Sequence, residues 1–162
     1  MASGDQRART PEELDGTGLR IGIVKARWNS DIVDRLEAGV DRGLLHLGIA
    51  SDAIVVESVP GSFEVPMGAR ILALSGSVDA IVTIGAVIRG ETTHYELVSE
   101  GAADGVQRVQ LDTGVPVAFG LVTVENREQA LARSEGPGGH NVGEEAALVA
   151  VEMALLAAKH RS

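Results

Sequence analysis

Short apolar segments alternate with longer segments of helical periodicity along most of the chain. Four runs rich in Val and Ile predict buried strands at residues 20–26, 54–59, 80–88 and 116–124. Apolar residues spaced three and four apart predict helices at residues 31–47, 65–74, 94–110, 127–133 and 144–159. Gly48 and Gly76 follow two of these segments, which is typical of the ends of helices.

Alternation of strands and helices predicts a parallel sheet that is covered on both faces, because continuous apolar strands need burial on each side. Four strands joined by right-handed crossovers give a small doubly wound α/β sandwich. We expect a single domain over residues 19–160 and a flexible N-terminal arm over residues 1–18, which are polar and lack a periodic pattern. Such folds bind ligands at the carboxyl ends of their strands, so the loops that follow the strands are the candidate site.

The composition narrows the class of protein. The formal net charge is −9, which disfavours electrostatic binding to nucleic acid or to an anionic membrane. The sequence contains no cysteine, which excludes disulfides, thiolate metal sites and thiol nucleophiles. No apolar run is long enough to span a bilayer, and residues 1–18 contain no segment typical of a secretory signal. We therefore expect a cytoplasmic protein without nucleic-acid or membrane partners.

The chain contains only four aromatic residues, so its core must be aliphatic. Trp28, Phe63 and Tyr95 lie in the loops after the first three predicted strands, and Phe119 lies within the fourth. Aromatic rings at strand ends can stack on a planar heterocyclic ligand. They can equally cover an apolar edge of the fold, and the sequence pattern alone does not separate these two interpretations.

The loop after the third strand carries candidate chemistry. Thr93 and Glu96 have the spacing of a capping box, which makes His94 the first residue of the following helix. The first amide groups of that helix, with Gly90 allowing close approach, form a possible anion site, to which Arg89 and Arg133 could add charge. The positive end of the helix favours neutral imidazole, which suits a proton carrier. The alternative is an ordinary capped helix with an exposed histidine.

Several common site motifs are missing from the sequence. No pair of histidines has the spacing of a metal site, so we expect no metal. There is no Walker A motif and no Gly-x-Gly-x-x-Gly after a strand, and Ser62 does not lie in a Gly-x-Ser-x-Gly elbow. A serine hydrolase or a nucleotide-binding domain of these types is therefore disfavoured.

Two long motifs identify a family resemblance. Pro60-Gly-Ser-Phe-Glu-Val-Pro66 and Gly85-Ala-Val-Ile-Arg-Gly-Glu-Thr-Thr-His94 strongly resemble the lumazine synthases, which catalyse the penultimate step of riboflavin biosynthesis. The resemblance covers about residues 18–160 and includes Trp28, Phe119 and the segment that ends at Arg133. It implies a flavodoxin-like three-layer sandwich. It also implies a transferase that condenses 5-amino-6-(D-ribitylamino)uracil with L-3,4-dihydroxy-2-butanone 4-phosphate to 6,7-dimethyl-8-ribityllumazine, without a cofactor.

The resemblance assigns roles to individual positions. It implies that the pyrimidine and its ribityl chain are bound by Trp28, Ser62, Phe63, Glu64, Ala86, Val87, Ile88 and Phe119. It implies that the phosphate is bound by Glu91, Thr92 and Arg133, and that His94 carries the proton. Phe119 would come from the neighbouring subunit of a homopentamer, with sites between subunits. The pentamers could also assemble into a shell.

One position departs from the family pattern. Relatives usually carry a lysine in an Asn-Lys-Gly setting, where this chain has Asn141-Val142-Gly143. A cation that would face the phosphate is missing, unless Arg133 suffices or His140 substitutes. Two other classes therefore stay open. One is a catalytically weak paralogue that binds a lumazine or flavin or forms a shell, and the other is a flavodoxin-like electron carrier.

Overall fold

The structure is a computed structural model that describes residue 11 and residues 14–161. Its strands are β1 (Ile21–Ala26), β2 (Ile54–Val59), β3 (Ala80–Ile88) and β4 (Val117–Val124). Its α-helices are α1 (Ser30–His46), α2 (Val65–Ser75), α3 (His94–Thr113), α4 (Arg127–Ala132) and α5 (Val142–Lys159). The predicted elements are all present. Helix α3 continues to Thr113 instead of ending near Gln110, and Gly114, with a φ of 76°, follows its last turn.

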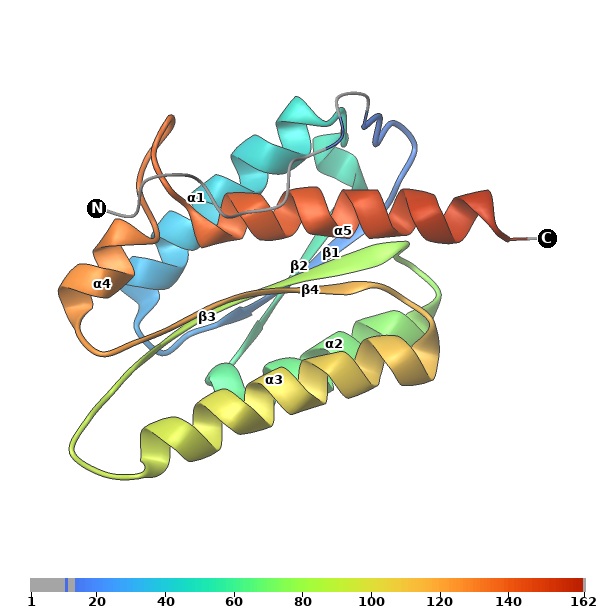
Figure 1. The fold of residues 1–162 in the computed structure, drawn as a ribbon. Coiled ribbons are helices and arrows are strands. Elements are labelled where there is room, and N and C mark those ends of the chain that lie inside the picture. The colour runs from blue at the N-terminus through green and yellow to red at the C-terminus, as the bar shows by residue number, and fades with distance from the viewer. Residues whose placement is uncertain (1–10, 12–13, 162) are drawn as a thin grey trace.

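All strand pairs are parallel, and the strand order is β2-β1-β3-β4. The sheet is the middle layer of three: α1, α4 and α5 cover one face, while α2 and α3 cover the other (Figure 1). The predicted flavodoxin-like three-layer sandwich is thus confirmed. Because every strand runs in the same direction, the carboxyl ends of all four meet at one edge of the sheet.

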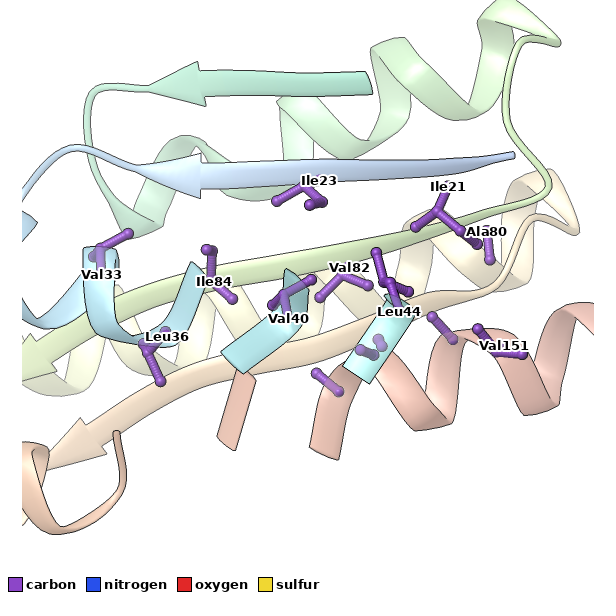
Figure 2. Packing of buried hydrophobic residues seen from close by; sticks show 14 of the residues in the cluster. Ile21, Ile23, Val33, Leu36, Val40, Leu44, Ala80, Val82, Ile84 and Val151 are labelled. Carbon is purple, nitrogen blue, oxygen red and sulfur yellow. The ribbon is translucent and has the colours of Figure 1, made fainter. Parts of the chain in front are cut away.

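The core is aliphatic, as the scarcity of aromatic residues predicts. On the α1 side, Leu36, Val40 and Leu44 pack with Val82 and Ile84 of β3, and all five are fully buried (Figure 2). A second cluster fills the space between the sheet and helices α2 and α3. Neither cluster contains an aromatic side chain. The four rings of the chain are therefore available for other uses.

Strand β2 departs from the expectation that every strand is covered on both faces. Val55, Val56, Glu57 and Ser58 are all exposed, because β2 is an edge strand and the covering helices lie mainly over its neighbours. Exposed apolar side chains on an unpaired edge strand are typical of a surface that binds another protein chain.

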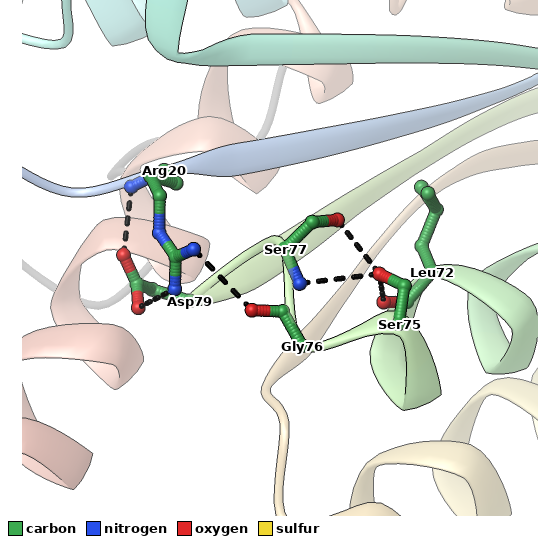
Figure 3. Close-up of polar contacts among 6 residues, drawn as sticks. All are labelled: Arg20, Leu72, Ser75, Gly76, Ser77 and Asp79. Carbon is green, nitrogen blue, oxygen red and sulfur yellow. Dashed lines mark hydrogen bonds and ion pairs between the residues drawn. The ribbon is translucent and has the colours of Figure 1, made fainter.

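The amino edge of the sheet is closed by Arg20 and Asp79, which precede β1 and β3 (Figure 3). The backbone N–H of Arg20 donates to Asp79 Oδ2 at 2.8 Å, and its guanidinium donates to Asp79 Oδ1 and to the Gly76 carbonyl, each at 3.3 Å. Burial raises the pKa of Asp79, but the hydrogen bonds from Arg20 outweigh burial and hold this pKa below its usual value.

The predicted N-terminal arm lies mostly outside the described residues, since residues 1–10, 12 and 13 are among those not described. Its last residues lie against the domain: Leu14 packs on the core, Gly16 is buried, and the Gly16 N–H donates to the Leu47 carbonyl at 2.7 Å.

In the part of the chain that the structure describes, no helix has both the length and the apolar character that a membrane span requires.

Candidate active site

Three turns meet at the carboxyl edge of the sheet and enclose a pocket of about 480 Å³. They follow β1, β2 and β3, as the topology predicts. Nine of the predicted site residues line this pocket: Trp28, Ser62, Phe63, Glu64, Ala86, Val87, Ile88, Thr92 and His94. The structure thus brings the Trp28 ring together with the end of β3 and the start of α3, which lie far from it in sequence.

Trp28 forms one wall of the pocket and is held by its neighbour. Its side chain is 73% exposed. Asn29 has a left-handed backbone conformation with a φ of 59°, and its Nδ2 donates to the Ala86 carbonyl at 2.9 Å. The Asn29 side chain thereby ties the turn that carries Trp28 to the end of β3. Asparagine is one of the few residues that adopt this conformation readily.

Ser62 lies beneath the pocket in a short 3₁₀ turn and is only 5% exposed. Its hydroxyl is buried and has no hydrogen-bond partner in the protein. A Cβ at Gly85 would lie 2.7 Å from this hydroxyl, so glycine in the middle of β3 makes room for the serine. Buried hydroxyls are rarely left unpaired, and this one is placed to pair with a polar group of a ligand.

The two residues after Ser62 are open to the pocket. Phe63 and Glu64 are exposed, and the phenyl ring packs close to the backbone of α3 at Gly101, where a Cβ would come within 2.7 Å of it. A glycine on α3 therefore lets the ring lie flat against the helix. The exposed carboxylate of Glu64 offers an acceptor for ligand hydroxyl groups.

The turn before α3 differs from the prediction. His94 is the first residue of α3, but Thr93 makes no side-chain capping bond, so the predicted capping box is wrong. The Glu96 carboxylate pairs with Arg89 instead, and a charge-assisted bond to a guanidinium is stronger than one to a neutral amide. The His94 N–H donates to Thr92 Oγ1 at 3.3 Å. Thr92 and His94 are exposed and face the pocket.

Three predicted site residues do not line the pocket of this single chain: Glu91, Phe119 and Arg133. Glu91 is exposed in the same turn as Thr92. Phe119 lies on β4 beside Thr83 of β3 and is 39% exposed. Arg133 follows α4, where its Nη1 donates to the Gln129 carbonyl at 3.0 Å. Phe119 and Arg133 therefore belong to the side of the molecule that carries the β4 edge.

The loop after Arg133 is fixed by a buried asparagine. Asn141 is 1% exposed, and its Nδ2 donates to the carbonyls of Arg35 and Glu135 at 3.1 and 2.9 Å. Its Oδ1 accepts from the Glu144 N–H at 3.1 Å and so caps α5. Val142, at the position where the family pattern has lysine, is the half-buried first residue of α5.

His140 is engaged beside Val142. Its Nε2 lies 3.1 Å from Glu145 Oε1. This contact places a carboxylate next to the imidazole that could have substituted for the missing lysine.

Among the residues that the structure describes, no three His, Asp or Glu side chains gather in a way that would hold a metal ion.

The pocket also contains residues that the sequence did not single out. Val98 of α3 and Pro60, directly after β2, line it alongside Asn29, and so does Tyr95, one of the rings considered for stacking. Val98 follows His94 by one helical turn, which is the spacing that could have identified it from the sequence. Tyr95 faces the pocket and lies beneath Arg89, whose Cζ is 4.4 Å from the ring centroid.

The fold and the pocket define an α/β protein of the doubly wound class, in which the pocket at the strand ends is lined by an exposed indole and by the first residue of a helix. Comparison with known families agrees with this class: the family model described as 6,7-dimethyl-8-ribityllumazine synthase matches residues 18–158. The chain belongs to the 6,7-dimethyl-8-ribityllumazine synthase family.

Similar proteins carry the same description. A 6,7-dimethyl-8-ribityllumazine synthase from Azoarcus sp. (strain BH72) is 42% identical over 96% of this chain and 97% of its own length. One from Paraburkholderia phymatum is 46% identical over 89% of this chain and 81% of its own length. One from the fungus Pyricularia oryzae is 40% identical over 89% of this chain and 90% of its own length.

Proposed function

We propose that this chain catalyses the condensation of 5-amino-6-(D-ribitylamino)uracil with L-3,4-dihydroxy-2-butanone 4-phosphate to 6,7-dimethyl-8-ribityllumazine, with release of phosphate and water. The observation that carries this proposal is the pocket itself. One cavity contains an exposed tryptophan, a buried unpaired serine hydroxyl and a histidine at a helix start. The family of the chain supports the same reaction.

The pyrimidine stacks on Trp28 and lies against the end of β3. Ala86, Val87 and Ile88 line the pocket, and we expect backbone groups of this segment to pair with the donors and acceptors of the ring edge. The ribityl chain extends toward the turn after β2, where its hydroxyl groups pair with Ser62 Oγ and the Glu64 carboxylate. The unpaired hydroxyl of Ser62 supports this assignment, because a ligand hydroxyl would satisfy it.

The phosphate binds in the turn between β3 and α3. We expect Thr92 to supply a hydroxyl, Glu91 to lie beside the anion in the same turn, and the amide groups in the first turn of α3 to bind it. His94 lies at the same helix start and carries protons during imine formation, phosphate loss and ring closure. Positioning and proton transfer are the main demands of this reaction, which explains why a site without a cofactor suffices.

We propose that Phe119 and Arg133 reach the pocket from a second copy of the chain. Two unlike apolar surfaces support this arrangement. The β2 edge and the outer side of α2 expose Val55, Val56, Met67, Ile71 and Leu74. The β4 edge and α5 expose Phe119, Val149, Met153 and Leu156, and a hollow of about 270 Å³ lies beside the last two.

Contact between two different surfaces of the same chain is head-to-tail, and such contacts form a ring when the rotation between neighbouring subunits closes. We infer a homopentamer with sites between adjacent subunits; further assembly of pentamers into a shell is a separate step. Arg133, donated across the contact, supplies the cation that binds the phosphate where Val142 replaces lysine. We expect the protein to act in the cytoplasm, where both substrates are small diffusible molecules.

The proposed reaction is tested by mixing the purified protein with both substrates and following the lumazine chromophore by absorbance and fluorescence. Product formed well above the uncatalysed background supports the synthase. Binding of the pyrimidine without product contradicts it and indicates a binding protein of the same fold. A reversible flavin redox signal in the purified protein would indicate an electron carrier instead.

The shared site is tested by subunit complementation. His94→Ala and Arg133→Ala chains are each expected to be weakly active alone. If His94 and Arg133 of one site come from different copies, refolding the two chains together at equal amounts restores about one quarter of the wild-type rate, since that fraction of sites is intact. No recovery in a mixture whose assembly state matches the wild type, measured by analytical ultracentrifugation, contradicts the shared site.

A further inference from the structure

Arg89 lies at the start of the turn between β3 and α3, to which the proposed function assigns the phosphate. It contacts elements on both sides of this turn. It is the first residue after β3, and its backbone N–H donates to the Val124 carbonyl at 2.8 Å. Its Nη1 bonds to Glu96 Oε1 in the first turn of α3, and its Nε lies 2.8 Å from Glu125 Oε2. The guanidinium also covers the Tyr95 ring. Arg89 is not among the residues that line the pocket.

The turn that Arg89 spans has little other support. A Cβ at Gly90 would meet no atom within 4 Å, so the turn does not pack closely on that side. Thr93 makes no capping bond, and the bond from the His94 N–H to Thr92 Oγ1 is long at 3.3 Å. The Arg89–Glu96 pair therefore joins the two ends of the turn that carries Thr92 and His94.

The same arginine connects this turn to the next one along the sheet. Glu125 begins the turn after β4, and its N–H donates to Gln129 Oε1 at 2.8 Å. Gln129 in turn accepts at its carbonyl from the Arg133 guanidinium. A continuous series of contacts thus runs from the first turn of α3 through Arg89 to the helix that precedes Arg133.

The charges around Arg89 also bear on its role. Arg89 faces the two carboxylates Glu96 and Glu125, and Glu96 Oε2 is buried with no partner of its own. The hydrogen bond from Arg89 holds the pKa of Glu96 below its usual value, so this carboxylate is ionised near a site that receives a phosphate. Two of its three guanidinium nitrogens, Nη1 and Nε, are engaged by these carboxylates, and Arg89 does not line the pocket, so its guanidinium is poorly placed to bind the phosphate itself.

We propose that Arg89 is a positioning residue that acts through Glu96 and Tyr95 to hold the Gly90–His94 turn in its phosphate-binding arrangement. This inference rests on the proposed function of the same pocket. A structural brace and a direct phosphate ligand differ in one respect: the brace needs Glu96, whereas a direct ligand would be released by the loss of Glu96.

The decisive variant is therefore Glu96→Ala. Removing a carboxylate near an anion site strengthens phosphate binding if charge alone matters, or if Arg89 is freed to bind the phosphate. If Glu96 instead holds the turn in place through Arg89, its removal weakens phosphate binding. We expect Glu96→Ala to raise the KM for the phosphorylated ketone about tenfold, with the KM for the pyrimidine within about twofold, because small misplacements of binding groups cost this much or more.

Two further variants complete the experiment. Arg89→Lys keeps the charge but loses the two-sided fork and the ring contact, and we expect the KM for the phosphorylated ketone to rise about fivefold. Glu100→Ala removes an exposed carboxylate from the same helix without touching Arg89, and this matched control should leave that KM within about twofold. Circular dichroism and melting temperature establish that each variant is folded.

A readout that does not depend on turnover separates this inference from the proposed function. Inorganic phosphate is titrated into each protein and followed by the ring-proton resonance of His94, assigned with His94→Ala. If wild-type protein makes no lumazine, the proposed function fails while this titration still tests Arg89. Tighter phosphate binding by Glu96→Ala, or wild-type binding by Arg89→Lys, overturns the positioning role.

Discussion

The amino and carboxyl edges of the sheet differ in whether their polar groups have hydrogen-bond partners within the protein. At the amino edge, Arg20 and Asp79 satisfy each other through backbone and side-chain hydrogen bonds. At the carboxyl edge, the Ser62 hydroxyl is buried without a partner, Asn29 has a left-handed backbone, and Trp28 is exposed. An edge that serves only the fold pairs its groups internally. An edge that binds a ligand keeps some of them open, at a cost in stability.

The largest expected effect comes from His94, at the carboxyl edge. We expect His94→Ala to lower kcat by about 10²–10⁴, the usual contribution of a general acid or base. The side chain is exposed, so the free energy of unfolding should change by less than about 0.5 kcal/mol. Steady-state kinetics and urea denaturation measure the two quantities. A variant that keeps its kcat would show that another group carries the proton.

The amino edge should give the reverse result. Asp79→Ala removes the acceptor of the Arg20 backbone N–H, which we expect to cost about 1 kcal/mol of stability, the net contribution of such a hydrogen bond. Because this pair lies at the opposite edge from the pocket, kcat and both KM values should stay within about twofold. A variant with normal stability and altered kinetics would contradict the division between the two edges.

Asn29 allows backbone strain and side-chain function to be separated. Asn29→Ala forces a left-handed alanine and should cost about 1–2 kcal/mol, whereas Asn29→Gly removes the strain. Both variants lose the bond to the Ala86 carbonyl, so both should raise the KM for the pyrimidine by about the same few-fold factor. Equal stability of the two variants, measured by urea denaturation, would show that the backbone conformation is not retained.

The smallest expected effect is a pH dependence at the amino edge. The pKa of Asp79 is lowered in the folded protein, so its ionised form contributes stability that is present above the unfolded-state value near 3.8 and is lost as the pH falls through the folded value. Asp79→Asn removes this contribution. The stability difference between wild type and Asp79→Asn, about 1 kcal/mol near pH 6, should therefore shrink toward pH 3. A stability difference between the two proteins that does not change with pH would contradict the lowered pKa of Asp79.

Local signals explain why most of the fold could be predicted from the sequence. The predicted bounds of β2 and β3 match the structure, because each is a run of Val, Ile and small residues bounded by turn-forming or charged residues. The exposure of β2 could not be predicted, since an apolar run does not reveal whether its strand lies at the centre or the edge of a sheet.

The same limit applies to the site. The turns could be located because parallel strands place their carboxyl ends together, and the family motifs named the residues within them. The contact between Arg89 and Glu125 could not be predicted from the sequence, because it depends on the pairing of β3 with β4. The capping box failed for a different reason: Glu96 had the correct spacing for the helix, but Arg89, seven residues before it, competed for its carboxylate.

Trp28 has a consequence for spectroscopy. It is the only tryptophan of the chain, and 73% of its side chain is already in water when the protein is folded. Its fluorescence therefore resembles that of the unfolded chain from the outset and changes little when the aliphatic core melts. A heterocycle stacked on the indole, in contrast, would quench it directly. Intrinsic emission of this protein is thus an occupancy signal for the pocket, while unfolding has to be followed by the helical circular dichroism signal.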